Sequence, residues 1–266
     1  MRIIDNCTVH IVGKSTVTPQ LNNWLADHNL AGVGNELEPR SGRELLCETA
    51  GRLCYWSFDK PRPGGTPAYF DRIKGEKHGS VFEHSSFNFI FGGISRSLSH
   101  ELVRHRAGWA FSQLSQRYVD ESDCAFVRPV ELIPGTTGYA LWVEGIRKTH
   151  VDYTTLVAEM LTRLEHMYDI CGAKADTTHN RKRARQTARS VLPNCTETFV
   201  FATANVRAIR HFLEQRGSAG AEPEIRRLAN RVLELVRDDS PNLFGDYQTN
   251  DLPDGTKEIF TTYPKV

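Results

Sequence analysis

Two periods in the spacing of apolar residues predict that this chain mixes strands with helices. Short stretches where polar and apolar residues alternate, or where aromatic and β-branched residues gather, predict strands. Longer stretches with apolar residues three or four positions apart predict helices that bury one face, and most of the stripe in the longest is expected to be core. The predicted strands cover 8–12, 87–91, 124–130 and 196–204, and the predicted helices cover 19–27, 44–55, 139–171 and 228–236.

Glycine and proline punctuate this pattern. Residues 31–41 are rich in glycine and predict a loop, and Pro61–Pro67 predicts a flexible loop. Gly92-Gly93 is expected to end the aromatic strand, Ser95 to cap the next helix, and Gly108 to end that helix.

The chain shows no internal repeat and no low-complexity tract. At 266 residues it could form one large domain or two small ones, and we expect a single domain over residues 1–266. Its last part, residues 247–263, surrounds Pro253-Asp254-Gly255 and predicts a C-terminal hairpin with a glycine-containing turn.

The richest chemistry lies between Arg104 and Tyr118. Arg104-His105-Arg106 is followed, after eight residues, by Ser115-Gln116-Arg117. We expect a helix that delivers cations into an irregular, partly apolar loop, where arginine can offer paired donors to phosphate or carbonyl oxygens. The alternative is a surface helix whose arginines are solvated.

Three further polar clusters stand beside predicted elements. His78, Ser80 and Glu83 precede the aromatic strand, and taken alone they leave a metal site open, although H-E-x-x-H is absent. Arginines spaced by four line one helical face, which is usually solvated. Asn205 can cap a helix that carries more cations. The first of these two helices carries Arg181, Arg185 and Arg189. The helix that Asn205 caps carries Arg207, His211 and Arg216 along it or just beyond it.

Together these motifs resemble the flavin-dependent thymidylate synthases. The likeness covers roughly residues 45–247 and rests on four separated motifs in the family's order. It implies an α/β fold, a twisted β-sheet packed with helices, and a homotetramer whose active sites are shared between subunits. It also implies FAD, NADPH as reductant, methylenetetrahydrofolate as the one-carbon donor, and dUMP as the nucleotide that is methylated to dTMP.

The resemblance also assigns roles to residues. It places the flavin at His78, Ser80, Glu83, Arg104, His105, Arg106, Gln113, Asn205, Val206, Arg207 and His211. It places the nucleotide at Glu101, Arg104, Gln113, Leu114, Ser115, Gln116, Arg117, Arg189 and Arg216, with Arg216 catalytic and no metal.

The implied reaction suits these side chains. Reduced flavin provides hydride, so no thiolate is needed, and no cysteine lies in the signature loop. A uracil that loses its N3 proton is anionic, and Arg216 is our candidate to stabilise it. Ser115 could be a nucleophile, but no histidine–acid pair is placed by sequence to activate it, and we favour a binding role.

The chain departs from the family at two places. One extra residue lies between Ala107 and Phe111, and Gly220 stands where many members have a histidine. A loop of small residues could leave room for a 2′-hydroxyl. We therefore hypothesise that UMP is also accepted, as by the UMP methylases of nucleoside-antibiotic pathways in this family.

Composition bears on other classes of function. Lys and Arg number 33 against 32 Asp and Glu, so a general nucleic-acid binder is not expected, although a module using residues 181–189 stays an alternative. A flavoprotein oxidoreductase that ignores nucleotides is another, and it lacks G-x-G-x-x-G. Six scattered cysteines, no signal peptide and no membrane-length apolar run predict a cytoplasmic protein that does not contact membranes.

Overall fold

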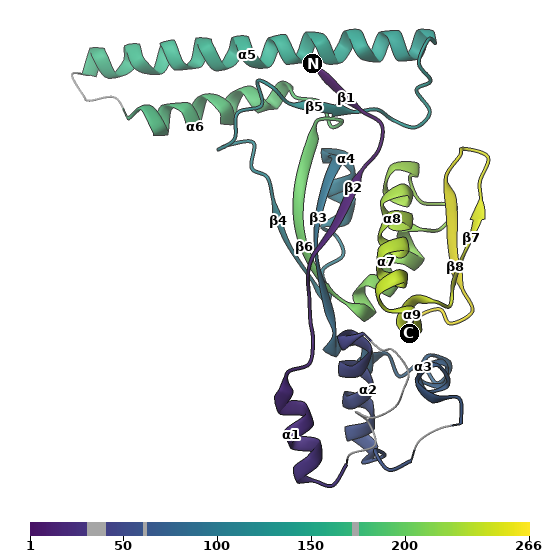
Figure 1. Cartoon of the computed structure of the whole chain (residues 1–266). Coiled ribbons are helices and arrows are strands. Elements are labelled where there is room, and N and C mark those ends of the chain that lie inside the picture. Colours follow the sequence, from purple (N-terminus) through teal and green to yellow (C-terminus); the bar gives the residue numbers. More distant parts are fainter. Residues whose placement is uncertain (31–40, 61–62, 172–175) are drawn as a thin grey trace. The chain divides into compact units, whose positions relative to one another are not determined.

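The chain folds into helices and strands arranged as two compact units. The structure, a computed structural model, describes residues 1–30, 41–60, 63–171 and 176–266 (Figure 1). What we call the α5 unit comprises residues 1–7, 92–101 and 112–200, and the α7 unit comprises 8–91, 102–111 and 201–266. The single domain expected from sequence stays a prediction, and the loop expected at 31–41 lies, apart from Ser41, outside the described residues.

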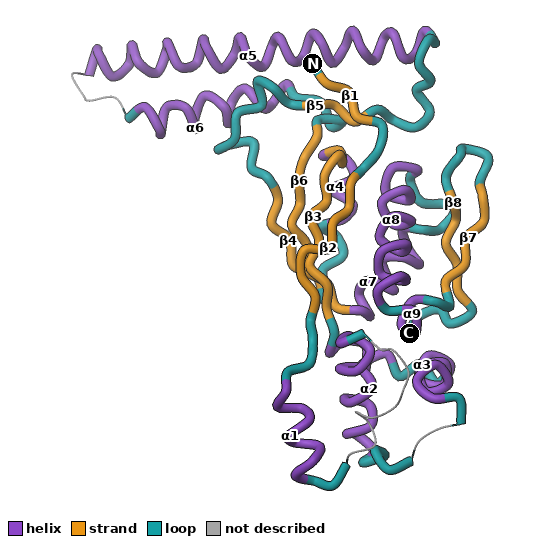
Figure 2. The backbone as a smooth tube through the Cα atoms, in the orientation of Figure 1, coloured by secondary structure: helices purple, strands orange, loops and turns teal. Residues whose placement is uncertain are grey.

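A four-stranded sheet is the largest sheet among the described residues. Its strand order is β2 (Thr8–Lys14), β3 (Ser86–Ser95), β6 (Glu197–Asn205) and β4 (Trp109–Gln113), as Figure 2 shows. Strands and helices together confirm the predicted α/β class. β2 and β3 contain the strands predicted at 8–12 and 87–91, and β6 lies one residue later than the strand predicted at 196–204.

Two glycines do not end elements as predicted. Strand β3 continues through Gly92-Gly93, because Gly93 adopts φ +62° and donates its N–H to Glu197 Oε1 over 3.1 Å. The helix α4 (Arg96–Leu102) stops well before Gly108, and residues 109–113 form strand β4 instead of an irregular loop. The predicted cap is confirmed, since Ser95 Oγ accepts the N–H of Leu98 at 2.9 Å.

The α5 unit is built on a parallel strand pair and long helices. Strand β1 (Arg2–Ile4) pairs with β5 (Ala125–Val127), and Phe126 packs with Ile146 of α5. This unit also contains most of α4, together with α6 (Thr177–Ala188) and the short 3₁₀ helix η2 (Arg189–Val191).

Helix α5 (Thr137–Cys171) buries less of its apolar stripe than predicted. Ile146 and Leu164 are buried, but Leu141 is 64% exposed and Met167 is 49% exposed. The expectation that most of this apolar stripe is core is therefore wrong for the single chain that the structure describes.

The α7 unit carries the remaining helices and the C-terminal hairpin. Its elements are α1 (Pro19–Asp27), α2 (Gly42–Tyr55), α3 (Gly65–Gly75), the 3₁₀ helix η1 (Gly79–His84), α7 (Val206–Arg216), α8 (Pro223–Asp239), α9 (Pro241–Phe244), and the antiparallel pair β7 (Tyr247–Asp251) and β8 (Lys257–Thr261). The hairpin forms where it was predicted. Residues 65–67 belong to α3, so the flexible loop predicted there is wrong, and a proline is tolerated because it lies in the helix's first turn.

A buried ion pair joins α7 to the segment before the hairpin. The fully buried Arg210 donates from both terminal nitrogens to the Asp246 carboxylate, each over 2.8 Å. Burial alone would raise the pKa of Asp246, but Arg210, with help from Lys74 and Thr261, outweighs it and lowers that pKa to about 2.

Candidate functional site

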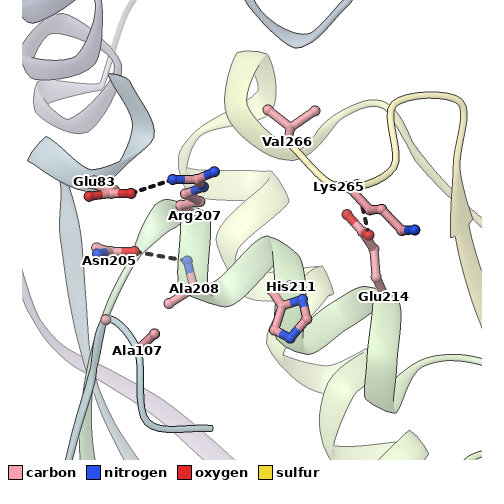
Figure 3. A pocket seen from close by; sticks show the side chains of 10 residues that line it. Glu83, Ala107, Asn205, Arg207, Ala208, His211, Glu214, Lys265 and Val266 are labelled. Carbon is pink, nitrogen blue, oxygen red and sulfur yellow. Dashed lines mark hydrogen bonds and ion pairs between the residues drawn. The ribbon is translucent and has the colours of Figure 1, made fainter. Parts of the chain in front are cut away.

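One face of α7 presents polar side chains to a cavity. Asn205 caps the helix by accepting the N–H of Ala208 at 2.8 Å, as the sequence predicted. Arg207, His211 and Glu214 follow at spacings of four and three and line the same cavity (Figure 3). We call this space of about 410 Å³ the α7 cavity.

The opposite wall of the α7 cavity comes from η1 and from the residues before β4. Glu83 Oε1 accepts from Arg207 Nη1 over 2.6 Å, so two residues far apart in sequence meet here (Figure 3). The carbonyl of Gly108 accepts the Asn205 N–H at 3.1 Å. The Gly108 backbone adopts φ +73°. A Cβ on Gly108 would lie 2.8 Å from the Ala208 Cβ, so this position requires glycine.

A second cavity, of about 440 Å³, is lined by residues of the Arg-His-Arg motif and the end of α7. We call it the Arg216 cavity. Arg216 Nε donates to His105 Nε2 over 2.9 Å. Nε2 of His105 is the acceptor in this hydrogen bond, and the tautomer that can accept there carries its proton on Nδ1. The Arg216 cavity is also lined by Arg104, Arg106 and Trp109. It shares Ala107 and His211 with the α7 cavity.

The α5 unit has a cationic cleft of its own, of about 450 Å³, which we call the Arg96 cleft. Arg96 and His100 of α4, Gln116, and Arg189 of η2 line it. Burial, and then the charge of Arg189, lower the pKa of Arg96. Gln116 is 6% exposed, and its Nε2 has no hydrogen-bond partner among the described residues. The cleft thus offers two guanidinium groups and an unused amide donor.

Gln113, Leu114 and Ser115 of the α5 unit make hydrogen bonds within that unit. Gln113 Nε2 donates to Ser99 Oγ over 2.8 Å, and the Leu114 N–H donates to the Phe199 carbonyl over 2.9 Å. Ser115 Oγ accepts the Arg117 N–H at 3.4 Å, a turn contact that does not activate a nucleophile. Glu101 lies in α4, one residue before its end.

Three predicted residues of the α7 unit lie outside these two cavities. The side chain of Val206 is fully buried, and its N–H donates to the Ser85 carbonyl over 2.9 Å, so it packs in the core. His78 precedes η1 with its Nδ1 3.6 Å from Glu76 Oε2, and Ser80 is exposed on η1.

The predicted site residues divide between the two units. The α7 unit holds His78, Ser80, Glu83, Arg104, His105, Arg106, Asn205, Val206, Arg207, His211 and Arg216, and the α5 unit holds Glu101, Gln113, Leu114, Ser115, Gln116, Arg117 and Arg189. Sequence reasoning missed Arg96 and Glu214, which line the cavities. Helical spacing could have found both, because Arg96 is four residues before His100 and Glu214 is three after His211.

Comparison with known proteins identifies the family. The family model described as thymidylate synthase complementing protein, Thy1, matches residues 37–242. The chain belongs to the flavin-dependent thymidylate synthase family. This confirms the resemblance carried by the Arg-His-Arg and Ser-Gln-Arg motifs.

Individual relatives agree. The chain is 43% identical over 218 residues to a flavin-dependent thymidylate synthase of Mycolicibacterium vanbaalenii, which covers 81% of this chain and 84% of the relative. It is 38% identical over 252 residues to that of Corynebacterium aurimucosum, covering 94% and 98%. The crystal structure of the UMP/dUMP methylase PolB from Streptomyces cacaoi has a TM-score of 0.61 at 22% identity, covering 92% of this chain and 96% of PolB, and it shares the fold.

The described residues show neither a metal-binding cluster nor a membrane-spanning helix. Within these ranges no group of three His, Cys, Asp or Glu side chains is placed to hold a metal ion. No helix there is both long and apolar enough to cross a membrane, and α5, although 35 residues long, is too polar.

Proposed function

We propose that this protein methylates C5 of uracil in dUMP and forms dTMP, with methylenetetrahydrofolate as the one-carbon donor. Family membership is the observation that carries this proposal, because relatives named flavin-dependent thymidylate synthases are 38–43% identical over most of the chain. The cationic cavities add physical support, since both a flavin dinucleotide and a nucleotide monophosphate are anionic.

FAD suits the donor set of the α7 cavity. Its volume of about 410 Å³ falls within the usual range of ligand pockets. Arg207 offers charge-assisted hydrogen bonds to phosphate, and Asn205 and His211 offer polar groups for the rest of the molecule. FAD, reduced by NADPH, would supply hydride. His78 and Ser80 remain proposed flavin contacts from the motif alone.

The nucleotide phosphate suits the Arg96 cleft. Arg96 and Arg189 are close enough for one to lower the pKa of the other, which an anion between or beside them would relieve. The buried, unpartnered Nε2 of Gln116 is a donor that a ligand oxygen can satisfy. We place Arg117 in the same role, since its Nε is also buried without a partner among the described residues.

Arg216 is the proposed catalytic residue. A guanidinium that faces the uracil carbonyl edge stabilises the anion formed when N3 loses its proton. The 2.9 Å hydrogen bond to His105 Nε2 orients that guanidinium before substrate binds. Protonation of His105 would remove the acceptor and place two cations side by side, so Arg216 needs a neutral His105.

We also propose a homotetramer with active sites shared between subunits. Exposed apolar side chains on α5 support an interface, because a face of this kind is usually covered. These include Leu141, Val151, Met167 and Ile170. Light scattering of the purified protein tests the assembly.

Product analysis tests the reaction. Protein, FAD, NADPH, methylenetetrahydrofolate and dUMP are mixed, and the nucleotide is identified by mass. We expect a gain of one methylene unit in dUMP. If FAD binds but no methylated nucleotide forms, the proposed function is wrong. Equimolar UMP and dUMP in one reaction decide whether the ribonucleotide is also a substrate, which stays a prediction.

A further inference from the structure

The hairpin β7–β8 returns the end of the chain to helix α7. The N–H of Ile259 donates to the Gly217 carbonyl over 2.7 Å, just beyond the end of α7. Arg210 Nη2 then donates to the Tyr263 carbonyl over 3.3 Å, so the buried ion pair of Arg210 with Asp246 also holds the chain beyond the hairpin. Residues 263–266, the terminal segment, therefore start from a fixed point.

Two contacts place the terminal segment itself. The N–H of Lys265 donates to Glu214 Oε2 over 3.0 Å, while Glu214 Oε1 accepts from the Tyr247 hydroxyl over 3.3 Å. Val266 is only 5% exposed. Its main chain lies so close to Gly79 that a Cβ there would be 2.6 Å from the Val266 carbonyl carbon and 2.8 Å from Arg207 Nε.

The terminal segment reaches the cavity that we assign to FAD. Lys265 and Val266 line it together with Glu83, Asn205 and Arg207 (Figure 3). About 410 Å³ stays open with the segment in place, so the segment bounds the cavity and does not fill it. It also lies beyond residues 37–242, the part of the chain that the family model matches.

We propose that the terminal segment is a wall of the flavin site and that its backbone position sets the affinity for FAD. This inference rests on the proposed function. The face of α7 that presents Arg207 and His211 to the cavity also presents Glu214, which holds Lys265. A ligand in the cavity is thus enclosed between residues of one rigid helix and a segment fixed to that helix.

The backbone of Lys265 offers a matched pair of substitutions. Lys265 has φ +60°, which glycine adopts freely and which proline cannot adopt. Lys265→Gly removes the side chain but keeps the N–H that Glu214 accepts. Lys265→Pro removes the N–H and forces the segment out of place. A chain that stops after Pro264 removes the wall altogether.

Equilibrium titration of the flavin-free proteins with FAD, followed by flavin fluorescence, tests the wall. We expect the shortened chain and Lys265→Pro to bind FAD about tenfold more weakly than the unmodified protein, while Lys265→Gly stays within about twofold, because an enclosing wall contributes through position and not through the lysine charge. Melting temperatures without flavin separate this effect from global unfolding.

Three results would overturn the wall. The first is an unchanged FAD affinity in both the shortened chain and Lys265→Pro. The second is tighter FAD binding in either of them, which would mean that the segment obstructs the site. The third is an equal loss of FAD affinity in Lys265→Gly and Lys265→Pro. Absence of FAD binding by the unmodified protein is a different result, and it would count against the proposed function.

Discussion

The Arg96 cleft and the α7 cavity differ in how the charges of their lining residues are balanced. In the α7 cavity, Arg207 is paired with Glu83, and Glu214 also lines the wall. In the Arg96 cleft, no acidic residue lines the described surface, and the charge of Arg189 adds to burial in lowering the pKa of Arg96. A cavity whose acidic and basic side chains offset each other suits a large ligand with neutral rings. A cleft with unpaired positive charge favours a compact anion.

The buried carboxyl groups of the two units show the same contrast. Asp246 in the α7 unit has Arg210, Lys74 and Thr261 as partners, and its pKa is lowered to about 2. In the α5 unit, burial raises the pKa of Glu121 to about 7, although the charge of Arg96 opposes the shift. Its Oε1 has no hydrogen-bond partner among the described residues. The Asp246 carboxylate is therefore stabilised by its partners, whereas burial disfavours the ionised form of Glu121.

The largest effect is expected at Arg216, which we propose as the catalytic residue. Arg216→Ala should leave FAD bound but reduce kcat by a hundredfold or more, since losing a charge placed at a developing anion costs about 3 kcal/mol. Flavin titration and single-turnover rates measure the two properties. Loss of FAD binding in this variant would move Arg216 from the catalytic to the cofactor role.

Asp246→Asn should destabilise the protein by about 3 kcal/mol, because it leaves the buried Arg210 with an unpaired charge. The contribution of Asp246 is complete above its ordinary pKa near 3.8 and is lost as the pH falls through about 2. Urea unfolding at pH 7 and at pH 3 measures it. A variant as stable as the parent would show that the ion pair does not hold α7.

Arg189→Ala should weaken nucleotide binding by about 1.5–3 kcal/mol with FAD affinity unchanged, since a charge-assisted hydrogen bond to phosphate is removed. The matched control is Arg183→Ala, an exposed arginine of α6 that does not line the cleft. Titration with dUMP at two salt concentrations measures both. Equal losses in the two variants would mean that the cleft acts only through general positive charge.

A further effect, which depends on pH, is expected at Glu121. An acid with a raised pKa binds its proton more tightly in the folded state, so stability should fall as pH rises from about 4.5 to about 7 and then level off. Glu121→Gln should abolish this slope and make the protein more stable than the parent at pH 8. Thermal unfolding across this pH range gives the answer, and a slope that persists in the variant would have another origin.

The sequence predicted the elements whose signals are local. The Asn205 cap, the Ser95 cap and the C-terminal hairpin depend on residues within a few positions of one another, and all three are in the structure. The motifs that resemble the flavin-dependent thymidylate synthases are also local, and the comparisons confirm membership of that family. Predictions were wrong where a glycine was taken as a stop signal, as at Gly93, because long-range bonds such as that to Glu197 decide whether a strand continues.

Contacts between distant segments were not predictable. Nothing in the sequence pairs Glu83 with Arg207, or His105 with Arg216, since each partner is more than 100 positions away. The pattern on α5 showed which side of the helix is apolar but not what covers it. The Asn205 cap placed Arg207 and His211 on one predicted helix, but Glu214, three residues after His211, was not singled out.

The way Lys265 and Val266 meet the cavity has a practical consequence for anyone who handles this protein. An affinity tag appended after Val266 would have to leave from a residue that is 5% exposed and lies against Gly79. A tag before Met1, which is 48% exposed, meets no such crowding. Purification through the amino end, or tag removal before flavin is measured, avoids recording the tag's interference as a property of the enzyme.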